Sequence, residues 1–233
     1  MSLEYLKIPP SYNYEVPMVK NHMELPLDEM PWEDFEKLSL RMVEYVEGFN
    51  RPNCEIFGRQ GQKQDGIDIY ALRENGKYYT FQCKKYKSIS TSDLNSIFSE
   101  FEDGEWYDKT EKFFICTSAD FNDVHLQKRF EELKGVYKKN GIQIDKWDYS
   151  SINRILKTHP QIVYDFFGPE WCKRFCGEEI YKNSIIALDF DKLKRSFTKA
   201  SSFLSGIKNY FEKDPQSHIN RKETKQIVNS RRR

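Results

Sequence analysis

The chain has 233 residues, of which 38% are hydrophobic and 31% are charged, so it can form one full domain with an appendage or two small domains. Its formal net charge is only +1, which excludes an argument for nucleic-acid binding from bulk electrostatics. The charge is uneven, however, because residues 191–233 hold 12 Lys and Arg against 4 Asp and Glu, a net of +8. Such a basic end either contacts nucleic acid or is an ordinary solvated surface.

The cysteines and the hydropathy pattern predict a reduced, cytoplasmic protein. The 5 cysteines are an odd number without regular spacing, which argues against a disulfide framework. No run approaches the roughly 18 apolar residues of a membrane span, and the first residues do not read as a signal peptide. We therefore expect neither membrane insertion nor secretion.

Strand and helix patterns alternate along the chain. Residues 1–30 are rich in proline and predict an extended arm without regular structure. A helix is predicted over residues 32–46, where apolar side chains recur near a period of 3.6 and acids occupy the first turn. The predicted strands are 55–57, 67–72, 77–85, 112–118 and 142–146. A second helix is predicted to begin at Ser90 or Ser92, and two more helices are predicted at 125–137 and 151–157.

These elements predict an α/β fold with a central mixed β-sheet flanked by helices and a C-terminal amphipathic helix. Asn75 and Gly76 between two strand patterns indicate a hairpin, and the later strand–helix–strand alternation indicates parallel crossovers. From Ile186 to Phe211 apolar residues alternate steps of four and three, as in a heptad-patterned helix that packs on its own domain or on a partner. The predicted regions are an arm at 1–30, a sheet domain at 31–180, this helix at 181–213, and a flexible tail or linker at 214–233.

Three polar residues lie in the hairpin strands at positions that apolar side chains normally occupy: Asp68, Gln82 and Lys84. If a carboxylate, an amide oxygen and an ammonium group converge, they suit a hard divalent cation, because Mg²⁺ prefers oxygen ligands and accepts phosphate and water as the remainder. Lys84 could then support a water nucleophile and stabilise charge on a phosphate. The alternative interpretation is a ladder of polar residues on a half-exposed sheet.

Whether these side chains share a site depends on the turn between the strands. With a two-residue loop of Asn75 and Gly76, Asp68 would pair with Cys83 and lie on the wrong face. With a three-residue loop whose Gly76 is left-handed, Asp68 would lie opposite Gln82. If the three residues form one site, we therefore predict the longer turn or a bulge in one strand.

Three motifs in combination resemble the Mrr-like restriction endonuclease branch of the PD-(D/E)XK nuclease superfamily. They are FEKL at residues 35–38, GQKQDGIDIY at 61–70 and QCKKYK at 82–87. The resemblance covers residues 32–120 and implies an endodeoxyribonuclease that depends on Mg²⁺ or Mn²⁺ and hydrolyses phosphodiester bonds in double-stranded DNA. The mixed sheet of that family agrees with the predicted fold.

By motif position, the resemblance implies a catalytic site of Glu36, Asp68, Gln82 and Lys84. Asp68, Gln82 and Glu36 would hold the metal, and Lys84 would be the catalytic lysine. Glu36 is also expected to face inward from its helical spacing, and burying a lone Glu is costly unless something pairs with it. Gln82 departs from the Glu usual in the superfamily, and a neutral amide is expected to bind metal more weakly. Asp65 is a secondary candidate.

The resemblance also implies DNA contacts and partners. Arg59, Lys85 and Lys87 flank the site and are candidates for phosphate contacts, with plain solvated charge as the alternative. Double-strand cleavage needs two sites, so a homodimer or higher oligomer is expected, assembled through the helix at 186–211. Residues 159–175 resemble the end of nuclease effector domains fused to signal-transduction NTPases in bacterial anti-phage defence systems, which implies a fused NTPase or sensor domain. The rival hypothesis is a non-catalytic nucleic-acid-binding or assembly module that retains the nuclease fold.

Overall fold

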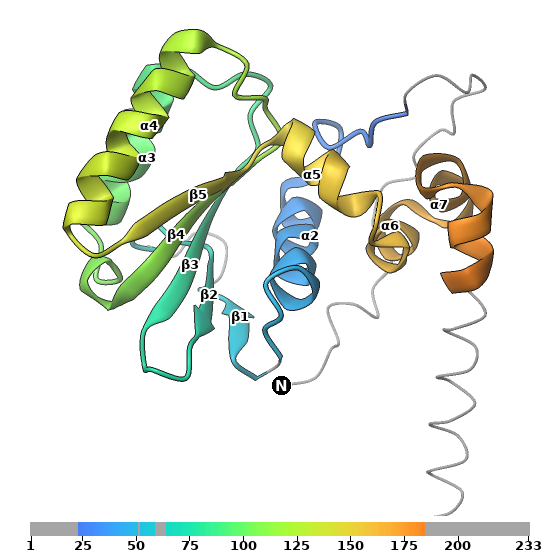
Figure 1. The fold of residues 1–233 in the computed structure, drawn as a ribbon, viewed down its shortest axis with the longest axis horizontal. Coiled ribbons are helices and arrows are strands. Elements are labelled where there is room, and N and C mark those ends of the chain that lie inside the picture. Colours follow the sequence, from blue (N-terminus) through green and yellow to red (C-terminus); the bar gives the residue numbers. More distant parts are fainter. Residues whose placement is uncertain (1–22, 51, 59–63, 185–233) are drawn as a thin grey trace, which may run out of the picture. The chain divides into compact units, whose positions relative to one another are not determined.

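The computed structural model describes residues 23–50, 52–58 and 64–184 (Figure 1). Most of the predicted arm, Arg59, and nearly all of the heptad-patterned helix and tail lie outside these described residues. The described part of the chain forms a five-stranded mixed sheet with helices on both faces, and this confirms the predicted fold class.

The sheet has the strand order β1-β2-β3-β4-β5, so sequence neighbours are also neighbours in space. The first three strands pair antiparallel, and β3, β4 and β5 pair parallel, as a hairpin followed by helical crossovers requires. The strand bounds are β1 Cys54–Ile56, β2 Ile69–Leu72, β3 Tyr78–Lys84, β4 Thr110–Thr117 and β5 Gln143–Trp147.

Three helices begin at side chains that cap them. Ser90 and Asp93 form a capping box at the start of α3, and Asp123 and Asp148 cap α4 and α5. The sequence analysis did not predict α6 and α7, which each begin with a proline at a position where the missing N–H is harmless. The helix bounds are α2 Trp32–Tyr45, α3 Thr91–Glu102, α4 Val124–Lys139, α5 Tyr149–Leu156, α6 Pro160–Phe167 and α7 Pro169–Cys176.

Two separate apolar clusters cover the two faces of the sheet. Figure 1 places α3 and α4 on one face and α2 and α5 on the other. Because alternate residues of a strand point to opposite faces, Phe81 and Cys83 of β3 join the α2 cluster. Thr80, Gln82 and Lys84 point to the α3 face, where Phe113 of β4 lies in the second cluster. The polar residues of β3 therefore share the α3 face.

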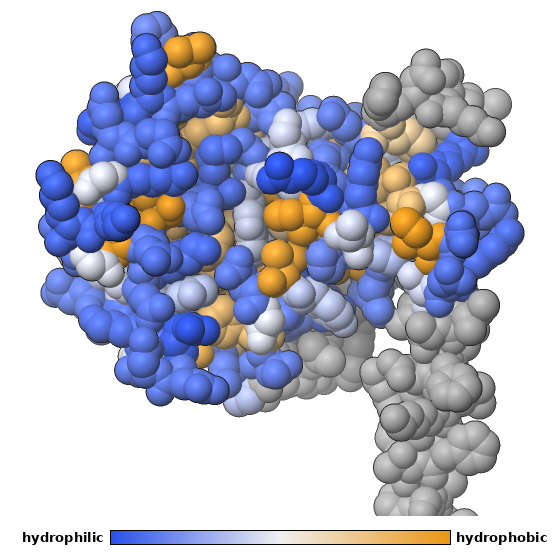
Figure 2. Space-filling view, in the orientation of Figure 1, coloured by the Kyte–Doolittle hydropathy of each residue, from blue (hydrophilic) through white to orange (hydrophobic). Residues whose placement is uncertain are grey.

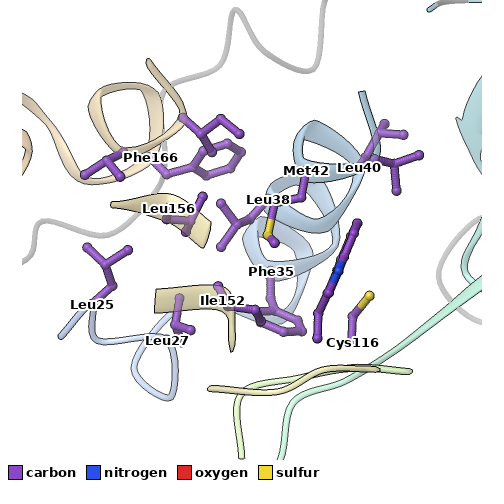
Figure 3. Packing of buried hydrophobic residues seen from close by; sticks show 14 of the residues in the cluster. Leu25, Leu27, Phe35, Leu38, Leu40, Met42, Cys116, Ile152, Leu156 and Phe166 are labelled. Carbon is purple, nitrogen blue, oxygen red and sulfur yellow. The ribbon is translucent and has the colours of Figure 1, made fainter. Parts of the chain in front are cut away.

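The α2 cluster also contains the segment that precedes α2. Figure 3 shows Phe35 and Leu38 of α2 in the same cluster as Leu25 and Leu27. Both of these leucines are fully buried, and the Leu25 amide donates to Asn153 Oδ1 at 2.7 Å. The described end of the predicted arm is thus fixed to the domain.

None of the helices in the described ranges combines the length and the apolar character needed to cross a bilayer. In the view of Figure 2 the surface is mostly hydrophilic, and its apolar residues form small, separated patches.

Candidate active site

The turn between β2 and β3 has the length that a shared site requires. The Arg73 amide donates to the Lys77 carbonyl at 2.8 Å, so the loop between the strands has three residues rather than two. Gly76 has φ +80°, the left-handed conformation expected for the longer turn. The register is unbroken along β2, from Ile69 opposite Phe81 to Leu72 opposite Tyr78, and Asp68 directly precedes the first of these pairs. The prediction of the longer turn is therefore confirmed, and the two-residue alternative is wrong.

Asp68 lies just before β2 and is only 6% exposed. Its Oδ2 accepts a hydrogen bond from the Cys83 amide at 2.6 Å, and its own amide donates to the Phe81 carbonyl at 2.8 Å. Burial raises the pKa of Asp68 to about 6, against the lowering effects of the Cys83 hydrogen bond and the Lys84 charge. The carboxyl group is thus fixed in place and would be stabilised in its ionised form by a cation.

Gln82 and Lys84 meet a single acid on α3. Glu100 Oε2 accepts from Gln82 Nε2 at 2.9 Å and from Lys84 Nζ at 3.1 Å. Gln82 is 3% exposed, and its buried Oε1 has no hydrogen-bond partner among the described residues. Because almost all buried polar atoms in folded proteins are paired, this oxygen needs an explanation, and a bound cation is one.

These groups line a pocket of about 410 Å³ between the loop before β2 and the end of α3. Four acids and one lysine contribute to the lining: Asp65, Asp68, Glu100, Asp103 and Lys84. The excess of negative charge favours a cation over an anion in the unliganded pocket. The secondary candidate Asp65 thus lies in the same pocket as Asp68.

Close backbone packing sets the shape of this pocket. A Cβ added to Gly66, which has φ +75°, would lie 2.6 Å from the Glu100 carbonyl oxygen. A Cβ added to Gly104 would lie 2.1 Å from the Asp65 carbonyl oxygen. Asp65 itself has a positive φ of 49°, which is uncommon for a residue with a side chain. Only glycines at positions 66 and 104 therefore let the loop before β2 pack against the end of α3.

Glu36 approaches the same end of the sheet from α2. Burial, with the negative charges of Asp68 and Glu33, raises the pKa of this half-buried acid to about 7, against the lowering effect of Lys37. The effect of Asp68 indicates that the two carboxyl groups are near each other. Glu36 is nevertheless not part of the pocket lining. The structure therefore brings Asp68, Gln82 and Lys84 into one pocket and leaves Glu36 beside it.

The pocket offers a small set of oxygen donors for a hard cation. No three side chains of His, Cys, Asp or Glu are gathered to hold a metal in the part of the chain that the structure describes. What the pocket offers is the Asp68 carboxylate with the unpaired amide oxygen of Gln82, both of them oxygen donors. Mg²⁺ commonly binds proteins through such a small set and takes its other ligands from water and phosphate.

Glu100 and Asp103 are acids of the pocket that were not predicted from the sequence, and Glu100 is the one that bonds Gln82 and Lys84. The predicted helix from Ser90 has an apolar face formed by Leu94, Ile97 and Phe101, all of which are buried. Glu100 precedes Phe101 and follows Ile97 by three positions, so it lies at the edge of the buried face. This position indicates that Glu100 lies close to whatever α3 packs against. Only the packing of α3 on β3 shows which strand the acid contacts.

The predicted phosphate contacts lie just beyond β3. Lys85 is half-buried and Lys87 is exposed, and both follow Lys84 directly in the chain. Arg59 lies outside the described residues. Neither lysine is part of the pocket lining, so their contact with phosphate stays a prediction.

One comparison with known proteins finds a family for the segment that contains this pocket. Residues 43–154 match the family model Mrr_cat_2, described as restriction endonuclease, and this segment includes Asp68, Gln82, Lys84 and Glu100 but not Glu36. No curated protein matches the chain. A solved structure of a protein of unknown function, AF1548, is similar with a TM-score of 0.33 and 19% sequence identity. The similarity covers 48% of this chain and 57% of that protein. The family match, together with the fold, shows that residues 43–154 form an Mrr-like restriction endonuclease domain.

Proposed function

We propose that this chain is a metal-dependent DNA endonuclease that hydrolyses phosphodiester bonds, with a nuclease domain at about residues 31–180. The observation that supports the proposal is the unpaired Oε1 of Gln82, buried in one pocket with the Asp68 carboxyl and the Lys84 amine. A ladder of polar residues that serves only the fold would be expected to satisfy its buried acceptors. An acceptor left for a ligand distinguishes a site from such a ladder.

Five residues in or near the pocket have a role in this proposal. Asp68 and Gln82 would hold Mg²⁺ or Mn²⁺, with Glu36 adding negative charge from α2. The metal, when bound, supplies charge neutralisation at the scissile phosphate and activates water. Lys84 would orient the attacking water and stabilise the negative charge that develops on the phosphate. Lys85 would contact the DNA backbone and position the strand.

The wider setting of this activity follows from the same resemblance. Double-stranded DNA would be the substrate, and a homodimer or higher oligomer would supply two sites for cleavage of both strands. The residues at 186–211 would provide the assembly helix. The enzyme would act in the cytoplasm as a restriction or anti-phage defence effector, regulated by a fused NTPase or sensor domain.

A plasmid-nicking assay tests the catalytic proposal. Supercoiled DNA is incubated with the chain in Mg²⁺, Mn²⁺ or EDTA, beside Lys84→Ala and the matched control Lys134→Ala, which removes an exposed lysine paired with Glu131 on α4. We expect metal-dependent cleavage that Lys84→Ala slows by about 10²–10³-fold, the usual loss when one charge-stabilising group is removed.

Two results would contradict this mechanism. Lys84→Ala that cleaves at the unaltered rate would remove the lysine from the chemistry. DNA binding without cleavage in either metal would instead support the non-catalytic binding module, for which the neutral Gln82 would be the explanation.

A further inference from the structure

The structure assigns a role to Glu100: we propose that it is the second carboxylate of the metal site, placed on α3 to supply the negative charge that Gln82 lacks and to orient Gln82 toward the metal. This inference rests on the proposed function of the pocket. It extends that function to a residue outside the three motifs, on a helix that the motifs do not cover.

The contact with Glu100 fixes the orientation of the Gln82 amide. An ionised carboxylate can only accept hydrogen bonds, so a contact with Glu100 selects the NH₂ end of the amide. The observed bond from Gln82 Nε2 to Glu100 Oε2 is 2.9 Å long. Because Nε2 is held by α3, Oε1 is turned away from Glu100 and remains the unpaired acceptor. Glu100 thereby makes Gln82 present an oxygen, rather than an NH₂ group, to a cation.

Glu100 also adds negative charge to the pocket. A neutral amide at position 82 leaves Asp68 as the acid contributed to the pocket by the paired strands, while Lys84 adds a positive charge on the same face. Glu100 Oε2 lies 3.1 Å from Lys84 Nζ and offsets that positive charge. With Glu100 included, the lining of the pocket holds four acids and one lysine, so the pocket can attract a divalent cation.

Packing on both sides holds the backbone of Glu100 in place. Phe101, the next residue, is fully buried and stacks on Phe113 of β4 with ring centroids 4.0 Å apart. The Glu100 carbonyl packs against Gly66, in the loop that leads to Asp68. The side chain itself is 48% exposed, so it reaches the open part of the pocket. A fixed backbone with an accessible carboxylate is suited to positioning.

The contact differs from an ordinary surface ion pair. Glu131 with Lys134 and Glu170 with Lys173 are exposed pairs three residues apart on one helix, and such pairs contribute little to stability. Glu100 instead joins α3 to β3 and bonds an amide that is only 3% exposed. The Glu131 pair therefore provides a matched control.

The test measures Mn²⁺ affinity by electron paramagnetic resonance titration on the full chain without DNA, and plasmid cleavage in parallel. We expect Glu100→Gln to weaken Mn²⁺ binding by about 10-fold or more, the usual range for losing a group that supports metal ligands. Gln82→Glu combined with Glu100→Gln moves the charge from α3 to β3 and reverses the hydrogen bond, so it should restore most of the affinity. Glu131→Gln should change neither measurement.

The outcomes separate this inference from the proposed function. Unaltered Mn²⁺ affinity in Glu100→Gln, or a double variant that binds no better than Glu100→Gln, would overturn the role of Glu100 even if the chain cleaves DNA. Metal binding that follows the expected order in a chain that cleaves nothing would support Glu100 and overturn the nuclease proposal. Absence of Mn²⁺ binding by the unaltered chain would overturn both.

Discussion

Thr80 and Gln82 are both buried on the same face of β3, yet their hydrogen bonding differs. Thr80 Oγ1 lies 3.1 Å from Thr110 Oγ1, which in turn donates to the Trp106 carbonyl at 2.8 Å. Gln82 donates to Glu100, but its Oε1 has no partner among the described residues. The comparison teaches that a buried polar residue in a strand does not by itself mark function. An unmet hydrogen-bonding capacity is the better indicator.

The surroundings of the two residues differ in the same way. Near Thr80 the face is covered by aromatic rings, with Tyr70 stacked on Trp106 at 5.1 Å and Tyr78 edge-on to it at 5.2 Å. Near Gln82 the face opens into the acidic pocket. One end of β3 is therefore closed by packing, while the other end is open to a ligand. Substitutions at and near the two ends of β3 test this difference between a closed end and an open end.

The largest effect is expected from the glycine that shapes the open end. Gly66→Ala adds a Cβ that would lie 2.6 Å from the Glu100 carbonyl, on a backbone with φ +75°. Gly76→Ala is the matched control, because its φ is +80° and its Cβ would have nothing within 4 Å. We expect the control to lower the free energy of unfolding by about 1–2 kcal/mol from backbone strain alone. Gly66→Ala should lower it by about 2–4 kcal/mol, because overpacking is added to the strain.

Urea unfolding measures both changes, and the cleavage assay shows whether the pocket survives. Cleavage should fall in Gly66→Ala and stay unchanged in Gly76→Ala, which lies at the other end of β2. Equal losses of stability, or a fall of cleavage in both variants, would show that the contact between the loop and α3 does not set the pocket.

The sequence was sufficient for the sheet and for four of the pocket residues, Asp65, Asp68, Gln82 and Lys84. Period-two and period-3.6 patterns predicted the strands and most helices, because one face of each is buried. The turn could only be posed as two alternatives, since Asn75 and Gly76 fit either loop length. Which one forms is set by the register of the two strands, in which Ile69 pairs with Phe81 and Leu72 with Tyr78.

What the sequence could not supply depends on tertiary packing. Helices α6 and α7 are eight residues each and are separated by Gly168 alone, so the stretch from Pro160 to Cys176 shows no single apolar period. Glu100 is one of several acids near the end of α3, and its sequence neighbours do not distinguish it. Its role becomes visible only when α3 packs on β3 and two donors meet one oxygen.

A smaller effect, on stability, is expected from the acid that approaches the open end from α2. Burial raises the pKa of Glu36 from 4.5 to about 7, so the folded state binds its proton more tightly than the unfolded state. The stability that this proton provides is complete below pH 4.5 and is lost as the pH rises through about 7. In EDTA at about pH 8, Glu36→Gln should therefore raise the free energy of unfolding by about 1 kcal/mol, a value reduced for partial solvation.

Thermal unfolding in EDTA at several pH values measures this effect. The gain should disappear near pH 4, where Glu36 is protonated in both states. A variant that is less stable than the unaltered chain at pH 8 would show that the Glu36 carboxylate is well satisfied without a metal, contrary to its proposed place beside the site.

The smallest effect is expected at the closed end of β3. Thr80→Val keeps the shape of the side chain and removes its hydroxyl, while Thr110 keeps its bond to the Trp106 carbonyl. Because no buried donor loses its acceptor, the free energy of unfolding should fall by less than about 1 kcal/mol, with unchanged cleavage and Mn²⁺ affinity. Gln82→Met is the counterpart at the open end, where it removes an unpaired buried oxygen.

The two substitutions should change the protein in opposite ways if the division of β3 is correct. Gln82→Met should leave the metal-free chain as stable as before, or more stable, because an unsatisfied polar atom is replaced by an apolar group of similar size. It should also abolish metal binding, which Thr80→Val leaves intact. A loss of cleavage in Thr80→Val as large as that in Gln82→Met would instead mean that the polar residues of β3 act as one ladder, and that the unpaired oxygen has no special part in it.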